Sequence, residues 1–150
     1  MSTEIRKHIG REISLLHRYT NLYIEAQLEA YDLKPGQYLF LSELFHIDDI
    51  TQDELANTLK FDKGTTARAL SILEAAGYIT REVDPTNRRC NRIRLTKKAQ
   101  AFKERFMGVI NSYEEVLTQG FSPQEKEITL DLVKRIAANA SNHWTALLNR

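Results

Sequence analysis

Cationic and hydroxyl side chains gather at two places in the middle of the sequence, and their chemistry suits a polyanion. The first group lies at the start of an expected helix and contains Lys63, Thr65, Thr66 and Arg68. The second lies in and beside an expected turn and contains Arg88, Arg89 and Arg92. Ammonium and guanidinium groups bind phosphates, and arginine also makes paired hydrogen bonds to the edge of guanine. Both groups therefore indicate binding to nucleic acid.

Two short helices are expected to position the first group. Thr51 and Glu54 form a capping box at the start of one helix, and Asp62 is a strong N-cap residue for the next, which Gly77 ends. Apolar residues at every third position predict the buried stripe of this second helix: Ala67, Leu70, Leu73 and Ala76. The first group then lies on the exposed side of its first two turns, where a recognition helix contacts DNA.

The residue types of this helix suggest separate roles in DNA contact. Arg68 is the candidate for a bidentate contact to guanine, whereas Lys63 is expected to bind phosphate. Thr65 and Thr66 are expected either to contact a phosphate or to place a methyl group against thymine, and both roles stay open.

A two-stranded ribbon is expected to carry the second group. Apolar and polar residues alternate from Tyr78 to Val83 and again from Asn91 to Leu95. The tip between them, residues 84–90, holds turn-forming residues and the adjacent Arg88 and Arg89. Narrow minor grooves attract inserted arginine through their negative potential. The alternative is a solvated hairpin whose arginines serve only solubility.

The distribution of charge agrees with a localised DNA-binding face. Residues 60–98 contain ten Lys or Arg and four Asp or Glu, whereas the rest of the chain contains eleven and sixteen. The formal net charge of +1 therefore conceals a basic region within a slightly acidic remainder. Because neutralisation of phosphates supplies most nonspecific affinity for DNA, the helix and the ribbon are expected to form the contact surface.

The stretch TQDELANTLKFDKGTTARALSILEAAGYITREVDP…RR…IRLT resembles the winged helix-turn-helix of the MarR (multiple antibiotic resistance regulator) family of transcription factors. The resemblance implies a mainly α fold with a small β-wing, in one domain over 1–150. Residues 33–96 would be the DNA-binding part, and 1–32 and 97–150 the dimerisation helices. The family's wing carries an Asp-x-Arg tripeptide, so Arg89 would enter the minor groove. Asn87 stands where the family has the aspartate, and the nearby Asp84 could substitute for it in steadying the wing.

The flanking segments have the periodicity of amphipathic helices. One is expected from Ile5 to about Tyr31, and another over residues 37–45, after a break at 33–36. Thr96 is expected to cap a helix that runs to Leu117, and residues 122–125 form a capping box for a last helix that runs to Leu147. The first and last helices carry more apolar surface than one neighbour covers, which favours a homodimer over the alternative of a monomer core. A two-fold dimer would bind a pseudo-palindromic operator, most simply as a repressor.

The resemblance also implies a small effector, because many members of the family release DNA when a phenolic or anionic molecule binds between the dimerisation helices and the winged part. His17, Tyr38 and Tyr113 are the candidates for lining such a crevice. The alternative for the two tyrosines is ordinary packing at the edge of the core with the hydroxyl in water, and the alternative for His17 is an ordinary surface residue.

Other functional classes are disfavoured by the sequence. The motifs G-x-S-x-G, Walker A, G-x-G-x-x-G and H-E-x-x-H are absent and the histidines are scattered, so no enzyme, cofactor or metal site is expected. His46 with Asp48 and Asp49 is the nearest approach to a metal-sensing cluster. A protein-interaction module remains an alternative, but such a module has less reason to concentrate cations on the helix and the wing.

Cys90, the single cysteine, lies among wing arginines that are expected to lower its thiol pKa, so a redox role stays open. One cysteine cannot form an internal disulfide, which fits a reducing compartment, and a cytoplasmic location is expected. No signal peptide or membrane span is visible in the sequence.

Overall fold

The computed structural model describes residues 7–149. The chain forms two compact units, Met1–Val109 and Ile110–Arg150, and each is considered by itself. The elements in chain order are α1 (Ile9–Leu28), the 3-10 helix η2 (Glu29–Tyr31), α2 (Pro35–His46), β1 (Ile50–Thr51), α3 (Gln52–Leu59), α4 (Lys63–Ala75), β2 (Ile79–Asp84), β3 (Asn87–Leu95), α5 (Lys97–Leu117) and α6 (Pro123–Leu148). The expected mainly α fold with a small β-wing is confirmed.

Local capping sets where the two central helices begin and end. The N–H of Glu54 donates to Thr51 Oγ1 at 3.2 Å, and the N–H of Thr51 donates to the Glu54 carboxylate at 2.9 Å, which starts α3 as expected. At the start of α4, the Asp62 side chain accepts the N–H of Thr65. Gly77 follows α4 with a φ of 82°, a conformation that glycine adopts without a Cβ clash.

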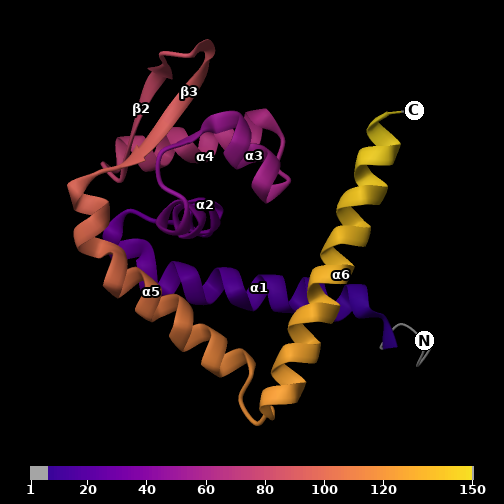
Figure 1. Cartoon of the computed structure of the whole chain (residues 1–150). Coiled ribbons are helices and arrows are strands. Elements are labelled where there is room, and N and C mark those ends of the chain that lie inside the picture. Colours follow the sequence, from indigo (N-terminus) through magenta and orange to yellow (C-terminus); the bar gives the residue numbers. More distant parts are fainter. Residues whose placement is uncertain (1–6, 150) are drawn as a thin grey trace. The chain divides into compact units, whose positions relative to one another are not determined.

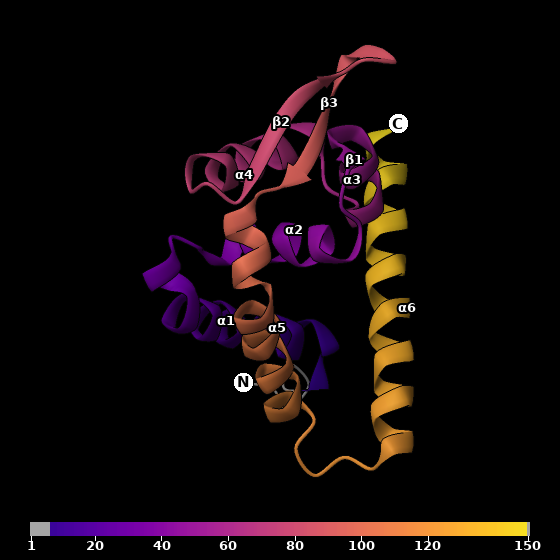
Figure 2. The ribbon, with the colours of Figure 1, turned by 60° about the vertical axis from the view of Figure 1, so that its left-hand side comes forward.

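The β-hairpin of β2 and β3 extends from the α3–α4 pair in both ribbon views (Figure 1, Figure 2). It belongs to an antiparallel sheet with the strand order β1-β3-β2, so the predicted two-stranded ribbon has a third, two-residue strand. β1 pairs Ile50 with Ile93 on β3. Two residues show no periodicity, and this strand was therefore missed in the sequence.

The tip of the hairpin differs from the predicted loop of residues 84–90. β2 and β3 close on a tight turn at 85–86, where Asp84 is paired with Asn87, and the next pair along β2 is Val83 with Asn91. Residues 88–90 are therefore the extra residues of a bulge in β3. A bulge re-aims the side chains of its strand and increases the local twist. Arg88 and Arg89 consequently lie in a bulge at the head of β3.

Aromatic and aliphatic side chains from α1, α2, α4 and α5 form the core of the first unit. Phe40, Leu44, Leu70 and Phe106 are almost fully buried. The hydroxyl of Tyr78, just before β2, donates to the carbonyl of Tyr31 at 2.6 Å. This core fixes α4 against the flanking helices and therefore fixes the direction in which its N-terminal end points.

The flanking helices match their predictions closely. Ile5 lies outside the described residues, and the helix expected to reach Tyr31 runs from Ile9 to Leu28 before η2. α2 begins at Pro35, two residues earlier than expected, because proline suits the first helical position. The hydroxyl of Thr96 accepts the N–H of Ala99 at the start of α5. The capping box at Ser122 opens α6.

The helices α1 and α6 each keep several apolar side chains exposed. On α1 these are Ile9, Ile13, Leu16, Tyr19 and Leu22. α6 has no buried residue, and its exposed apolar side chains include Ile128, Leu130, Leu132, Val133, Trp144 and Leu147. Among the described residues, no helix has the length and apolar character needed to cross a bilayer.

Candidate nucleic-acid interface

The N-terminal end of α4 is organised around Asp62. One carboxylate oxygen accepts the N–H of Thr65 at 2.7 Å, and the other accepts the Thr65 hydroxyl at 2.6 Å. The hydrogen bonds from Thr65, helped by the charge of Arg68, hold the pKa of Asp62 below its usual value. The Asp62 side chain is therefore ionised at neutral pH and anchors the first turn of the helix.

Arg68 lies back over this first turn. Its Nη2 donates to the Thr65 hydroxyl at 3.1 Å. A Cβ placed on Gly64 would lie 3.3 Å from Arg68 Nη1, so the absence of a side chain at Gly64 leaves room for the guanidinium. Arg68 is exposed, as expected, and one weak local hydrogen bond holds it. A base edge in the major groove can replace that bond at low cost.

Lys63 and Thr66 lie one turn apart on the same helix but differ in exposure. The Lys63 side chain is 82% exposed, and its ammonium is 3.7 Å from a carboxylate oxygen of Asp53. Thr66, by contrast, has 0% exposure and its hydroxyl donates to the carbonyl of Asp62 at 2.9 Å. The predicted exposure of Thr66 is therefore wrong. It belongs to the buried stripe, together with Ala69, Leu70 and Leu73.

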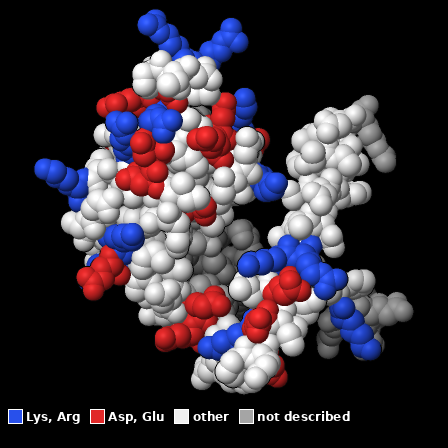
Figure 3. Space-filling model, in the orientation of Figure 1, with Lys and Arg blue, Asp and Glu red and all other residues white. Residues whose placement is uncertain are grey.

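The bulge at the hairpin tip presents Arg88 and Arg89 to solvent. Basic side chains project from this tip at the top of the space-filling view (Figure 3). The side-chain oxygen of Asn87 accepts the N–H of Arg89 at 3.2 Å, which fixes the backbone below the guanidinium. Within residues 7–149, neither arginine forms an ion pair with an acidic side chain. Both side chains are available to a phosphate or a groove.

Arg92 has a different environment from its two neighbours. Its Nη1 donates to the carbonyl of Asp49 at 2.8 Å, and its Nη2 donates to the carboxylate of Asp84 at 3.2 Å. Only 29% of its side chain is exposed. The hydrogen bond to Asp49 and the two carboxylates raise the pKa of Arg92. The guanidinium predicted to contact DNA is thus bound to the protein's own acidic groups.

Cys90 does not have the electropositive surroundings that the sequence led us to expect. Its Sγ donates to a carboxylate oxygen of Asp53 at 3.6 Å and accepts from the Asn87 amide at 3.3 Å. Burial, and then the nearby Asp53, raise the pKa of the thiol. The expected lowering of this pKa by the wing arginines is therefore wrong in sign, because the fold partly buries the sulfur and places a carboxylate beside it.

The acidic loop before β1 bonds to the wing. Asp48 accepts the backbone N–H of Leu95 at 2.9 Å, and Asp49 accepts hydrogen bonds from Arg92 and Arg94. Nδ1 of the His46 ring is 2.8 Å from the carbonyl oxygen of Ser42. Among residues 7–149, no group of three or more His, Cys, Asp or Glu side chains has an arrangement that could hold a metal ion.

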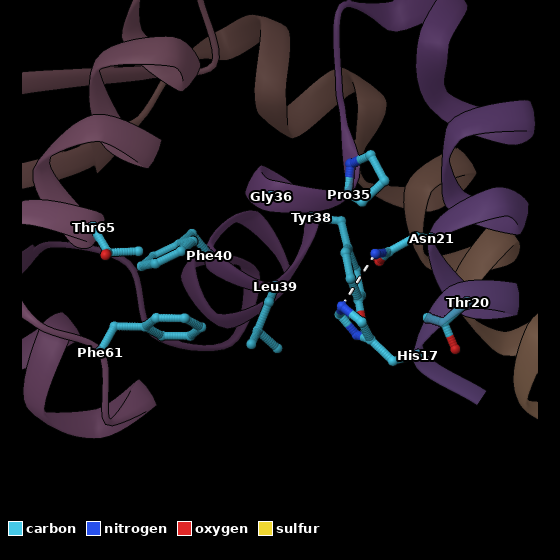
Figure 4. Close-up of a pocket in the computed structure, with 10 residues that line it drawn as sticks. All are labelled: His17, Thr20, Asn21, Pro35, Gly36, Tyr38, Leu39, Phe40, Phe61 and Thr65. Atoms are coloured by element: carbon cyan, nitrogen blue, oxygen red, sulfur yellow. Dashed lines mark hydrogen bonds between the residues drawn. The ribbon is translucent and has the colours of Figure 1, made fainter. Parts of the chain in front are cut away.

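A pocket of about 480 Å³ lies within the first unit, between α1, α2 and the start of α4 (Figure 4). Its lining residues are His17, Thr20, Asn21, Pro35, Gly36, Tyr38, Leu39, Phe40, Phe61 and Thr65. The structure therefore brings together two of the three candidate effector residues, His17 and Tyr38. Tyr113, the third, lies on the part of α5 that belongs to the second unit, and it does not line this pocket.

The pocket has a polar and an apolar end. His17 and Asn21 on α1 face each other, with 3.2 Å between His17 Nε2 and Asn21 Nδ2. Phe40 and Phe61 pack against each other at the other end in a tilted arrangement, with ring centroids 5.1 Å apart. Thr65, which also bonds to Asp62 and Arg68, lies beside them. Sequence reasoning missed Asn21, Phe61 and Thr65 as lining residues, since only the tertiary fold joins α1 to α4.

Comparisons with known proteins identify the family. A MarR family model matches residues 33–91. The helix-turn-helix-type transcriptional regulator YybA of Bacillus subtilis is 30% identical over 136 residues, which cover 91% of each chain. A MarR transcriptional regulator from Methanosarcina mazei Go1 is 34% identical with a TM-score of 0.80, covering 88% of this chain and 95% of its own. A MarR protein from Peptoclostridium difficile is 27% identical with a TM-score of 0.89, covering 98% and 96%. This chain belongs to the MarR family of winged-helix transcriptional regulators.

Proposed function

We propose that this regulator binds a pseudo-palindromic operator as a homodimer, represses transcription by occluding a promoter, and releases DNA when a small effector binds. The observation that carries the DNA-binding part is the pairing, in one compact unit, of an exposed cationic helix end with an exposed cationic hairpin tip. Lys63, Thr65 and Arg68 supply the helix end, and Arg88 and Arg89 supply the tip.

The two elements serve different grooves in this proposal. The N-terminal residues of α4 enter the major groove, where Arg68 reads a guanine and Lys63 and Thr65 contact the backbone. The hairpin tip reaches the neighbouring minor groove, into which Arg89 inserts. Arg92 is excluded from this surface in our proposal, because its guanidinium is bonded to Asp84 and Asp49.

Binding to DNA can be tested before the operator is known. The affinity for a random-sequence duplex, measured by fluorescence anisotropy, should fall steeply as salt rises, with a slope of about −0.9 in log–log form for each phosphate neutralised. The variant with Arg88→Gln and Arg89→Gln should have a shallower slope than the wild type. A protein-interaction module would instead bind duplex DNA weakly at every salt concentration.

Exposed apolar faces support dimerisation. α1 leaves one apolar row exposed, and α6 leaves apolar side chains exposed along its length, more than a monomer usually retains. A second copy would cover them and would space two recognition helices about one DNA turn, or about 34 Å, apart. Sedimentation equilibrium should give a dimer for the wild type. Leu132→Glu should shift it toward monomer, whereas Lys134→Glu, at an exposed polar position on α6, should not.

The pocket supports an effector that combines an aromatic ring with a polar group. Phe40 and Phe61 offer an apolar wall, while His17, Asn21 and Tyr38 offer hydrogen-bonding groups. A ligand that binds only the folded protein raises the melting temperature. A thermal-shift screen of phenols and aromatic acids should therefore find stabilising compounds whose effect is reduced by Tyr38→Ala and retained in Tyr113→Phe. Equal responses of both variants to every compound would refute this assignment.

A further inference from the structure

We propose that Gly64 is a specificity-determining residue of α4, because its missing side chain leaves the space in which Arg68 is held toward the N-terminal end of the helix. Gly64 is thus a positioning residue, and it acts on DNA through Arg68. This inference rests on the proposed DNA-binding function, and in particular on the reading of a base by Arg68.

The direction of Arg68 follows from helix geometry. Side chains of an α-helix lean toward its N-terminus, so a long side chain covers the residues three and four positions earlier. For Arg68 these are Thr65 and Gly64. Arg68 Nη2 donates to the Thr65 hydroxyl at 3.1 Å, and Nη1 lies 3.3 Å from the position that a Cβ on Gly64 would take. The guanidinium therefore lies at the end of α4 that contacts base edges in our proposal.

The space beside Gly64 is too small for a methyl group. A Cβ there would lie 3.3 Å from Arg68 Nη1 and 3.3 Å from Asp62 Oδ1, shorter than the 3.4 to 4 Å of ordinary van der Waals contact. Asp62 accepts two hydrogen bonds from Thr65, at 2.7 and 2.6 Å, whereas Arg68 is held by the longer 3.1 Å bond. An added methyl group is therefore expected to displace the guanidinium more than the carboxylate.

The position of Arg68 in the free protein affects the cost of reading a base. Arginine has many rotamers, and ordering such a side chain at an interface costs conformational entropy. Gly64 lets the Arg68 stem lie along the helix surface, already directed at the N-terminal end of α4. When the guanidinium exchanges the Thr65 hydroxyl for a guanine edge, the stem keeps this direction, so less entropy is lost on binding.

Gly64→Ala gives opposite predictions for folding and for base readout. Alanine favours a helix more than glycine does, so the thermal midpoint should be unchanged or higher. The methyl group displaces Arg68, and discrimination at the base pair that Arg68 reads should fall by about two- to tenfold, the cost of ordering one long side chain. The measurement compares affinities for single base-pair variants of an operator that the wild type selects from a random duplex pool.

The matched control is Gly36→Ala. Gly36 is the second residue of α2, as Gly64 is the second residue of α4, and a Cβ on Gly36 would meet no atom of residues 7–149 within 4 Å. Gly108→Ala, within α5, is a second control with the same open surroundings. Both controls gain helix propensity, and both should keep the wild-type discrimination at every base pair of the operator.

A double-mutant cycle separates the positioning of Arg68 from other effects of the methyl group. A clash with DNA, or a shift of the Asp62 cap, would persist without the Arg68 side chain. In an Arg68→Ala background, Gly64→Ala should therefore have no effect on discrimination. Two results would overturn the role of Gly64: wild-type discrimination in the Gly64→Ala variant, or an equal loss of discrimination in both backgrounds.

Failure of the proposed function would give a different result. If Arg68→Ala alone left discrimination unchanged at every base pair, Arg68 would not read a base, and the proposed readout would be refuted together with the role of Gly64. A wild type that fails to bind duplex DNA would refute the proposed DNA binding itself, and with it any positioning role in DNA contact.

Discussion

Replacing Arg68 with alanine should cost affinity and, more specifically, selectivity. A bidentate contact from arginine to guanine contributes about 1 to 3 kcal/mol of discrimination, which corresponds to about fivefold to 150-fold in affinity. Among residues 7–149, the hydrogen bond that Arg68 gives up to make that contact is the exposed 3.1 Å bond to Thr65. The cost of its release is therefore small, and most of the discrimination should remain measurable.

The assay begins with an operator selected from a random duplex pool by the wild-type protein. Affinities of wild type and Arg68→Ala are then compared on the operator and on every single base-pair variant of it. The variant should lose discrimination at one base pair in each half-site and keep it elsewhere. Because Arg68 is exposed, the free energy of unfolding should change by no more than about 0.5 kcal/mol, so the effect is not one of folding.

Lys63→Ala is the matched control at the same end of α4. A lysine that contacts phosphate contributes equally to all sequences, so this variant should weaken binding uniformly and reduce the salt slope by about 0.9. The reasoning about base readout would be refuted if Arg68→Ala weakened all duplexes by the same factor, as expected for Lys63→Ala.

Four further outcomes are expected. Thr51→Ala should lower the free energy of unfolding by about 1 kcal/mol in urea titration, because the capping box of α3 loses its hydroxyl; no change would mean that the cap is not formed. Tyr78→Phe should cost about 1 kcal/mol through the lost bond to the Tyr31 carbonyl, and an unchanged urea midpoint would contradict that bond. Cys90→Ser and the wild type should bind DNA equally well, with or without brief peroxide treatment, because the raised pKa of the wild-type Cys90 thiol keeps its sulfur protonated at neutral pH. An oxidant effect confined to the wild type would contradict this. Hydrogen bonds from Thr86 lower the pKa of Asp84. The contribution of the ionised Asp84 to stability is therefore present above about pH 4 and is lost as pH falls through the lowered pKa. The difference in urea midpoint between wild type and Asp84→Asn should be constant from pH 8 to 5 and shrink only below about pH 4.

The helices were predictable because their ends are set locally. Thr51, Asp62 and Ser122 each accept a backbone N–H within the next turn, so neighbouring residues in the sequence are enough to locate the start of the helix. Gly77 likewise ends α4 through its own backbone conformation. These local features were enough to predict the fold class and the position of the recognition helix in the sequence.

The error at Thr66 comes from the geometry of the helix. Successive steps of three residues turn through 300°, so a row such as Ala67, Leu70, Leu73 and Ala76 drifts around the helix by 60° at each step. Ala67 and Ala76 are accordingly only half-buried. The observed stripe alternates steps of three and one, and it includes Thr66 because its hydroxyl is satisfied by a backbone carbonyl.

The environment of the wing was not predictable, because acidic residues far away in the sequence determine it. Asp49 bonds to Arg92 and Asp53 bonds to Cys90, and neither pair is close in the chain. The arginines of the wing sequence therefore led us to expect too much free positive charge at the wing, and to expect a lowered pKa for the Cys90 thiol where the pKa is raised. The predicted substitution of Asp84 for the absent aspartate at Asn87 agrees with its bonds to Arg92 and Thr86.

Hydrogen exchange measured with and without duplex DNA tests the central claim most directly, because it reports which segments DNA covers. Random-sequence duplex added to the wild-type protein at low salt should slow exchange in two segments, the start of α4 at 60–68 and the hairpin tip at 84–92. High salt should abolish the protection. Protection confined to other segments, or none in either segment under conditions where DNA is bound, would contradict the assignment of α4 and the wing as the DNA-binding surface.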